Sequence, residues 1–409
     1  KLMRANPYRG LSKEIYVLFI TRIVNCMGSF IFPLLTLILT KKIGMTGTEA
    51  GFLISIGGIL NILSSIIGGK ITDVFGRKKI IIICTSLAAA CYIVPALFDM
   101  SIKMVPFLLA ASVFYGIAGP AQGAMVADLT TPQNRDEAYS LFYLGMNVGF
   151  AVSPIVGGIL FEHYLRFLFI MDAATSFICI ILIMLYIPET IGKTKEKLSP
   201  GRKLEESMEG SIISVLKERP VLLFFALVMF GYNFIYSQWG FLYPLHMENL
   251  FAGHGAKIYG GLMSLNAIEV IILTPFLTKF SKTSGNLKNI ILGGVFYTLG
   301  LGLIPGFSNK LSWFYVGVFV LTLGEIVISI SSSSFIANHT PASHRGRMNS
   351  VLPIIIQLGD TLGPTIVGIM LGYMSISITW RFLGAIMAVF TVFSFFLWKY
   401  DVKSKKVYS

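Results

Sequence analysis

The stretch that decides the fold reads Gly69-Lys70-Ile71-Thr72-Asp73-Val74-Phe75-Gly76-Arg77-Lys78-Lys79, and it separates two long apolar runs, residues 50–68 and 80–98. Each run approaches the roughly 20 apolar residues that a helix needs to cross a bilayer. The charged stretch therefore predicts a tight hairpin between two membrane helices. We expect Gly69 to allow close approach of two backbones and Gly76 to take a positive φ. The alternative is a basic loop that only orients the chain in the membrane.

The composition is that of a membrane protein. Of the 409 residues, 55% are hydrophobic and only 13% are charged, whereas soluble domains carry about 25% charged residues. Only helices and closed barrels satisfy their backbone in lipid, and the chain shows no strand-like alternation. We therefore predict an all-α protein with twelve spans, at residues 15–39, 48–69, 79–99, 105–128, 137–161, 165–187, 220–245, 257–279, 288–306, 312–337, 348–373 and 379–399. No small-residue cleavage site follows the first span, so we expect no removable signal peptide.

The net charge of +13 reports membrane orientation and not a nucleic-acid partner. With these spans, about 25 of the 33 Lys and Arg residues lie on one side of the membrane and about 7 on the other, as the positive-inside rule describes. We expect a multi-pass protein of the cell inner (plasma) membrane with both termini in the cytoplasm. The four cysteines are expected to pack inside spans, and no metal, cofactor or catalytic constellation is found, so an enzyme is not expected.

The chain divides into two similar halves. A polar segment follows the sixth span, so we predict a first six-helix bundle at residues 1–190, a cytoplasmic linker at 191–218 and a second bundle at 219–409. Three residues of the fifth span recur in the eleventh: Gly149 as Gly359, Pro154 as Pro364 and Gly158 as Gly368. The repeat indicates two bundles related by an axis along the membrane normal.

Two motifs carry a family resemblance. Gly69, Asp73, Gly76, Arg77 and Lys78 match the loop 2–3 signature of the major facilitator superfamily, Gly-x-x-x-Asp-x-x-Gly-Arg-Lys/Arg. The fifth span, Gly149-x-x-x-Ser153-Pro154-x-x-Gly157-Gly158, resembles the motif of the twelve-span drug:proton antiporters, with Ser153 replacing a glycine. The resemblance implies twelve helices in two pseudo-symmetric six-helix bundles, with a substrate site between them. Ser112 stands where that family usually carries an arginine, which argues against a proton relay at that position.

The resemblance also implies a gating latch. In it Asp73 and Asp128 would pair with Arg77, with Gly69 and Gly76 shaping the turn. The alternative for Asp128 is a proton carrier.

A second set of residues is expected to form a hinge or helix interface. Proline removes a helical hydrogen bond and glycine permits close helix contact. Generic packing is the alternative for all six: Gly149, Pro154, Gly158, Gly359, Gly363 and Pro364.

Charges inside spans are costly and usually functional. Glu325 is the first candidate for a proton carrier, with Asp360 and Glu269 as further acids and Arg22 as a cation that balances one of them. A structural role is the alternative for each acid. Asp172, in a span expected at the periphery, is expected to form a structural pair.

The seventh span places Tyr232, Tyr236 and Trp239 at spacings that share one helical face. They are expected to line a cavity for flat lipophilic molecules, together with Asn25, which lies on the polar stripe of Arg22. Packing and the interfacial belt are the alternatives.

These features favour a proton-coupled antiporter that exports lipophilic, cationic small molecules by alternating access. We expect a monomer whose partners are the substrate, protons and the lipid bilayer, and which needs no cofactor beyond the proton gradient. A symporter or facilitator of a metabolite, peptide or lipid is the main alternative. A membrane receptor that transports nothing is a second one.

Overall fold

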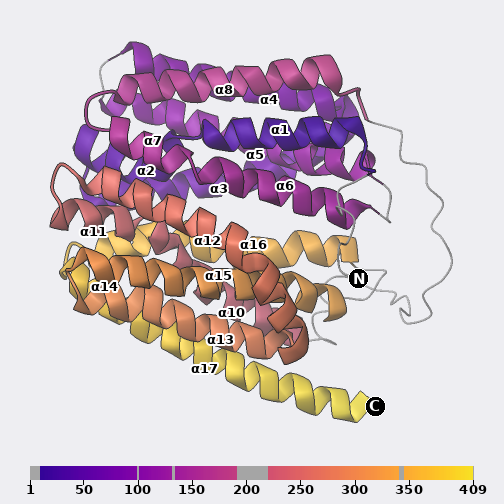
Figure 1. Ribbon diagram of the computed structural model, residues 1–409, viewed down its shortest axis with the longest axis vertical. Coiled ribbons are helices and arrows are strands. Elements are labelled where there is room, and N and C mark those ends of the chain that lie inside the picture. The colour runs from indigo at the N-terminus through magenta and orange to yellow at the C-terminus, as the bar shows by residue number, and fades with distance from the viewer. Residues whose placement is uncertain (1–9, 99–100, 131–133, 191–219, 340–344, 409) are drawn as a thin grey trace. The chain divides into compact units, whose positions relative to one another are not determined.

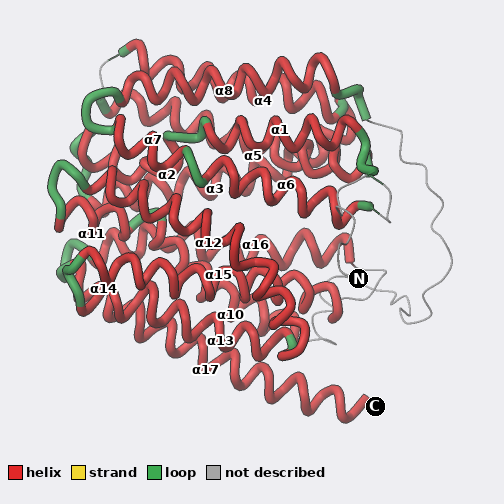
Figure 2. Tube along the Cα trace, viewed as in Figure 1, coloured by secondary structure: helices red, strands yellow, loops and turns green. Residues whose placement is uncertain are grey.

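The computed structural model of the chain describes residues 10–98, 101–130, 134–190, 220–339 and 345–408 (Figure 1). Helices make up nearly all of this part of the chain, and none of its residues is in a strand (Figure 2). The predicted all-α fold is therefore confirmed.

Twelve helical segments of the described chain are long and apolar enough to span a membrane, as predicted. Their bounds are Lys13–Lys42, Gly47–Phe75, Arg77–Leu97, Ile102–Asp128, Ala138–Leu160, Leu165–Tyr186, Pro220–Leu250, Gly255–Ser281, Asn286–Phe307, Leu311–Ser332, Leu352–Met370 and Ile376–Lys403. The ends differ from the predicted ones by a few residues, because helices continue past the apolar run into charged flanks.

Several spans are built from more than one helix. The first half contains α1 (Lys13–Met27), α2 (Ile31–Leu37), α3 (Gly47–Phe75), α4 (Arg77–Leu97), α5 (Val105–Asp128), α6 (Arg135–Phe150), α7 (Ser153–Leu160) and α8 (Leu165–Tyr186). The second half contains α10 (Pro220–Tyr236), α11 (Leu242–Leu250), α12 (Gly255–Ser284), α13 (Asn286–Thr298), α14 (Ile304–Phe307), α15 (Leu311–His339), α16 (Arg345–Met370) and α17 (Ile376–Tyr408). Short π- or 3₁₀-turns join some of them, at Ile38–Lys42, Ile102–Met104, Ser237–Trp239 and Leu299–Leu303.

The chain forms two compact units. Unit 1 takes residues 1–45, 56–197 and 247–271, and unit 2 takes residues 46–55, 198–246 and 272–409. The six-plus-six division of the chain stays a prediction, and the linker predicted at 191–218 lies outside the described residues.

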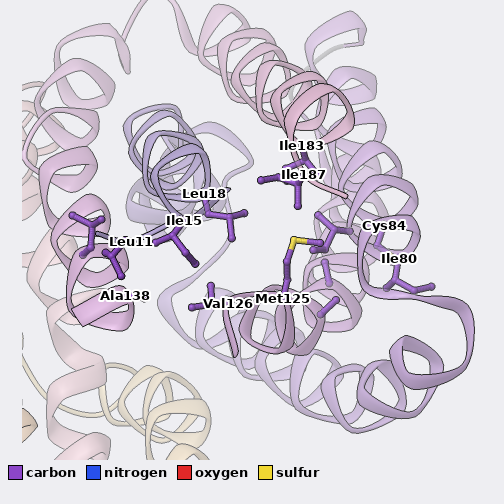
Figure 3. Packing of buried hydrophobic residues seen from close by; sticks show 14 residues of the cluster. Leu11, Ile15, Leu18, Ile80, Cys84, Met125, Val126, Ala138, Ile183 and Ile187 are labelled. Atoms are coloured by element: carbon purple, nitrogen blue, oxygen red, sulfur yellow. The ribbon is translucent and has the colours of Figure 1, made fainter. Parts of the chain in front are cut away.

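The core of unit 1 is apolar side chains from α1, α4, α5, α6 and α8 (Figure 3). Ile15, Ile81 and Met125 are almost fully buried there, and Cys84 packs among them. All four cysteines are free thiols, in line with the packing role expected for them. Burial of this core fixes α4, which begins with Arg77, and Ile71 of α3 packs against it.

Most of the charged stretch is helical, so the turn within it is shorter than the sequence suggested. Helix α3 continues through Asp73 to Phe75, and α4 begins at Arg77, so Gly76 alone makes the turn. Gly76 has a φ of 100°, as predicted. Gly285, between α12 and α13, has a φ of 86° and makes the corresponding turn in the second half.

The close approach predicted at Gly69 is wrong. Gly69 lies inside α3, and a Cβ added to it would meet nothing within 4 Å among the described residues. Because the turn is one residue long, Gly69 lies nearly two helical turns away from it.

The two repeated prolines act differently. The fifth span breaks between Phe150, where α6 ends, and Ser153, where α7 begins with Pro154 at its second residue. Helix α16 continues without a break through Pro364. The proline that interrupts a helix is thus the one in the first half.

Candidate functional site

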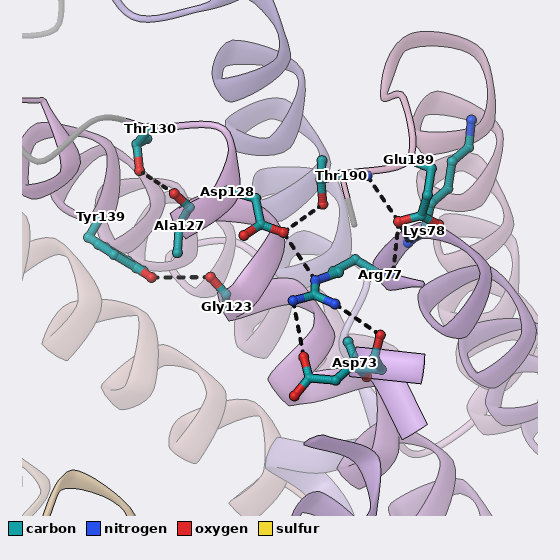
Figure 4. A network of polar contacts seen from close by, with 11 residues as sticks. Asp73, Arg77, Lys78, Gly123, Ala127, Asp128, Thr130, Tyr139, Glu189 and Thr190 are labelled. Carbon is teal, nitrogen blue, oxygen red and sulfur yellow. Dashed lines mark hydrogen bonds and ion pairs between the residues drawn. The ribbon is translucent and has the colours of Figure 1, made fainter. Parts of the chain in front are cut away.

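Arg77 is the centre of a polar network at one end of unit 1 (Figure 4). Its Nη2 lies 3.0 Å from Oδ1 of Asp73, one turn earlier on α3, and its Nε donates to Oδ2 of Asp128 over 3.1 Å. Its Nη1 donates to the carbonyl of Thr72 at 3.1 Å, and the hydroxyl of Thr190 donates to the same Asp128 oxygen at 3.0 Å. The structure therefore brings together the three charged residues of the predicted latch.

The two ion pairs of Arg77 lie in different surroundings. The side chain of Asp73 is 71% exposed, whereas those of Asp128 and Arg77 are 12% and 15% exposed. Water screens an exposed pair, so such a pair contributes about 0–1 kcal/mol. The pair of Arg77 with Asp128 therefore stabilises this end of unit 1 more than the pair with Asp73.

Glu189 is part of this network and was missed from sequence. Its Oε1 accepts a hydrogen bond from the backbone N–H of Arg77 at 2.8 Å, and its Oε2 accepts one from the N–H of Lys78 at 3.2 Å. A carboxylate at the first turn of a helix satisfies free N–H groups and interacts favourably with the helix dipole. No signal in the sequence identifies it, because Glu189 is 112 residues away from Arg77.

Gly76 is required for a second reason. A Cβ at this position would lie 2.5 Å from Oε2 of Glu189, closer than non-bonded atoms approach. The glycine therefore supplies both the positive φ and the room for the carboxylate that caps α4.

The predicted hinge glycines lie at close helix contacts. A Cβ on Gly149 of α6 would lie 2.5 Å from Cβ of Cys26 on α1, within unit 1. A Cβ on Gly359 of α16 would meet the carbonyl of Phe230 on α10, within unit 2. In each half of the chain, the repeated glycine therefore packs against the first helix of that half: Gly149 against α1 and Gly359 against α10.

Three further hinge residues also lie where backbones are close. A Cβ on Gly158 would lie 2.9 Å from Cα of Lys257, and one on Gly363 would lie 3.0 Å from the carbonyl of Phe234. The carbonyl of Pro364 faces Gly51 so closely that no side chain fits there. These contacts agree with a packing role as well as with a hinge.

Glu325 has a specific partner. It lies on α15 and is half-buried, and its Oε1 accepts a hydrogen bond from the hydroxyl of Tyr236 on α10 at 3.0 Å. The Tyr236 ring stacks on that of Tyr297, with centroids 5.6 Å apart. The predicted carrier and one predicted cavity residue therefore touch inside unit 2.

The other two acids are placed differently. Asp360 is exposed on α16 and belongs to unit 2, as Glu325 does. Glu269 is half-buried on α12, in the part of that helix that belongs to unit 1. The structure therefore groups Asp360 with Glu325 and assigns Glu269 to the other unit.

Tyr232 and Trp239, which were expected to line a cavity, are both buried in unit 2. Tyr232 is 1% exposed and lies in the interior of unit 2, where its hydroxyl donates to the carbonyl of Ile290 and contacts the hydroxyl of Ser394 at 2.9 Å. Trp239 is 5% exposed and packs edge-on against Tyr243. It also belongs to the 3₁₀-turn at Ser237–Trp239, which breaks the expected common helical face.

Arg22, which was expected to balance an acid, contacts a sulfur and an aromatic ring within unit 1. Its Nη2 lies 3.2 Å from the sulfur of Met146, and its guanidinium carbon lies 4.9 Å from the centroid of the Phe142 ring. No carboxylate of the described chain is within ion-pair distance of it. The reason is that α6 presents an aromatic ring and a thioether to α1 at this depth.

Asp172 has the structural role expected of it, with a different partner. Its Oδ2 accepts hydrogen bonds from the backbone N–H groups of Phe30 at 3.2 Å and Ile31 at 3.3 Å. These groups begin α2, so the buried acid on α8 caps a helix instead of pairing with a cation.

The part of the chain that the structure describes contains no cluster of three or more His, Cys, Asp or Glu residues that would hold a metal ion. The candidate site thus consists of two polar groups in separate units: Arg77 with its carboxylates, and Glu325 with Tyr236.

The fold and these sites define a class of polytopic membrane proteins with twelve spans, and sequence comparison identifies the family. The profile of the Major Facilitator Superfamily matches residues 18–352 and again residues 253–408. The chain belongs to this superfamily and is a multi-pass membrane transporter.

Relatives and solved structures agree with this family. The Na(+), Li(+), K(+)/H(+) antiporter of Planococcus maritimus is 24% identical and covers 94% of both chains. The multidrug resistance protein MdtH of Salmonella arizonae is 23% identical, over 88% of this chain and 86% of that protein. The structure of a peptide transporter POT in complex with sulfate superposes with a TM-score of 0.77 at 19% identity, covering 97% of this chain and 95% of the other. The nucleoside transporter NupG gives 0.76 at 15% identity, covering 95% and 100%. At such identities the two structures show the shared fold alone.

Proposed function

We propose that this transporter is a proton-coupled antiporter that exports lipophilic cations by alternating access. The observation that supports this most directly is the contact of Glu325 with Tyr236. A carboxyl that is half-buried in a membrane helix and accepts a hydrogen bond from a tyrosine hydroxyl can bind a proton or a cation, and ionisable groups at such depth usually have a functional role. Asp360, an exposed residue of the same unit, adds a second carboxyl.

In the proposed cycle, Glu325 takes up a proton when the site faces the outside. It releases the proton when the site faces the cytoplasm, and the free carboxylate then attracts the cationic substrate. Competition for one carboxylate couples the two fluxes, so neither ATP nor a cofactor is needed. The proposal places the protein, as a monomer, in the inner membrane with both termini in the cytoplasm, on the charge distribution of the sequence.

The Arg77 network supports a latch in this cycle. Asp73 and Asp128 hold the beginning of α4 against the ends of α3 and α5 through one guanidinium. We propose that this arrangement is remade each time the transporter changes state.

Inorganic monovalent cations are a second candidate substrate. The relative from Planococcus maritimus, which covers nearly the whole chain, is named as an antiporter of Na(+), Li(+) and K(+) against H(+). A small cation would use the same carboxylates without needing an aromatic cavity. This candidate gains weight because Tyr232 and Trp239 are buried in the interior of unit 2.

The test is substrate-induced proton movement in vesicles that contain the purified protein. We would add tetraphenylphosphonium, sodium, lithium and potassium ions, a neutral sugar and a dipeptide one at a time. Protons moving opposite to a lipophilic cation support the first candidate, and protons moving opposite to sodium, lithium or potassium support the second. Protons moving in the same direction as a sugar or peptide overturn antiport.

Glu325→Gln should abolish the proton movement, because glutamine keeps the shape and a hydrogen-bond acceptor but cannot be ionised. Glu162→Gln is the matched control, since Glu162 pairs with Lys42 at 3.1 Å with its side chain 34% exposed and is distant in sequence from the candidate site. Full gradient-driven transport by Glu325→Gln would remove Glu325 as the carrier.

A further inference from the structure

A cavity inside unit 1 contains the guanidinium of Arg22. It has a volume of about 30 Å³. Its wall is formed by side chains of α1, α4, α5, α6 and α8: Leu18, Thr21, Arg22, Asn25, Ile81, Thr85, Gln122, Val126, Phe142, Cys179, Ile180 and Ile183. None of these is acidic. The cavity therefore carries one positive charge and no compensating negative one.

Two hydrogen-bonding groups around this cavity have no partner in the described chain. Nε of Arg22 and the hydroxyl of Thr85 are buried without a hydrogen bond among the described residues. Asn25 and Gln122, which are half-buried, add their side-chain amides to the lining of the same cavity. All four side chains carry N–H or O–H donors. Buried polar groups are normally satisfied by protein, water or a ligand, so Nε of Arg22 and the Thr85 hydroxyl favour a ligand that accepts hydrogen bonds in this cavity.

The contacts that Arg22 does make are weak. A thioether sulfur is a poor acceptor, and a cation–π contact supplies no negative charge to the guanidinium. A charge at membrane depth is costly unless it is paired or hydrated. An anion in the cavity would supply both the missing charge and the missing acceptor.

The size of the cavity decides what kind of anion fits. A buried water needs about 10–15 Å³ of such space, so this cavity holds about two waters or one small anion. Drug-sized ligands occupy about 300–1,000 Å³, so the cavity is too small for the proposed export substrate.

We propose that this cavity is a binding site for a small monovalent anion, chloride being the commonest, held by Arg22, Thr85, Asn25 and Gln122. The inference stands on unit 1 alone and does not depend on the proposed antiport. The bound anion neutralises Arg22, which has no ion-pair partner among the described residues of unit 1.

The experiment measures binding of radiolabelled chloride to the purified full-length chain in lipid nanodiscs, with gluconate keeping the ionic strength constant. The wild-type protein should show saturable binding that bromide displaces. Arg22→Gln should abolish it. Arg381→Gln should leave it unchanged, because Arg381 lies in unit 2 with its guanidinium carbon 4.3 Å from the centroid of the Phe307 ring, and so loses an equivalent cation and ring contact.

Thr85→Val keeps the proposal testable if Arg22→Gln fails to fold. Valine matches the shape of threonine without the hydroxyl, and one hydrogen bond to a charged group is worth about 1.5–3 kcal/mol. The chloride affinity should therefore fall by about tenfold or more.

Three results would overturn the proposal. The first is a wild-type protein without saturable chloride binding, which would leave the cavity to water. The second is unchanged binding by Arg22→Gln or Thr85→Val. The third is saturable binding of acetate without binding of chloride, which would assign the cavity to a carboxylate-bearing ligand.

Discussion

A single residue, Gly76, sets the geometry between α3 and α4. Its φ of 100° is a conformation that residues with a Cβ rarely adopt, and its missing side chain leaves room for Glu189. Gly69, seven residues earlier, has neither constraint. The two glycines of one motif therefore differ in what they contribute to stability.

Gly76→Ala should destabilise the protein by about 1–3 kcal/mol, because alanine is strained at this φ and its Cβ would displace the Glu189 carboxylate. Gly69→Ala is the matched control, and it should be neutral or stabilising by up to about 1 kcal/mol, since alanine favours a helix interior. Thermal unfolding of the two variants in the same detergent checks this. Equal melting temperatures would contradict the account.

At the scale of the element, the beginning of α4, the third span, depends on a residue that follows the end of the sixth span. The carboxylate of Glu189, just past α8, accepts the N–H groups of Arg77 and Lys78. Helix α3 begins differently, because Glu49 bonds the N–H and hydroxyl of Thr46 only three residues away. One helix start is thus held by a tertiary contact and the other by a local one.

Glu189→Ala should therefore expose the first N–H groups of α4, at a cost of about 0.5–2 kcal/mol, the usual effect of losing a cap. Hydrogen exchange of a peptide that covers residues 76–80 should become faster. Glu49→Ala should speed exchange at the beginning of α3 and leave residues 76–80 protected. If residues 76–80 exchange at the same rate in both variants, Glu189 does not cap α4.

At the scale of the whole molecule, the two carboxylates that pair with Arg77 are expected to contribute differently to stability but equally to transport. Asp73 is mostly exposed and Asp128 mostly buried. Removing an exposed partner changes the free energy of unfolding little, whereas removing a buried one leaves Arg77 partly uncompensated. A latch that is remade in each cycle would nevertheless need both.

Asp73→Asn should slow transport severalfold, with substrate affinity and melting temperature close to those of the wild type. Asp128→Asn should slow transport as well and also lower stability by about 1–3 kcal/mol, because a charged hydrogen bond is lost in a buried setting. Transport rates in vesicles and thermal unfolding of the same preparations check both. An unchanged turnover of Asp73→Asn would refute the latch.

The sequence alone determined the twelve spans, the all-helical fold and the turn at Gly76. These depend on local properties: the length of apolar runs and the conformational freedom of glycine. The loop motif also singled out Asp73 and Arg77, and the family resemblance added Asp128, which lies at the end of the fourth span.

Only the tertiary structure decided which side chains meet across distant segments. It assigned Glu189 to the beginning of α4, buried Tyr232 inside unit 2 and gave Arg22 a ring and a sulfur instead of an acid. The pattern along a membrane helix does not determine these outcomes, because both its lipid-facing and its protein-facing sides are apolar. Which side faces a neighbouring helix is settled by packing of the whole bundle.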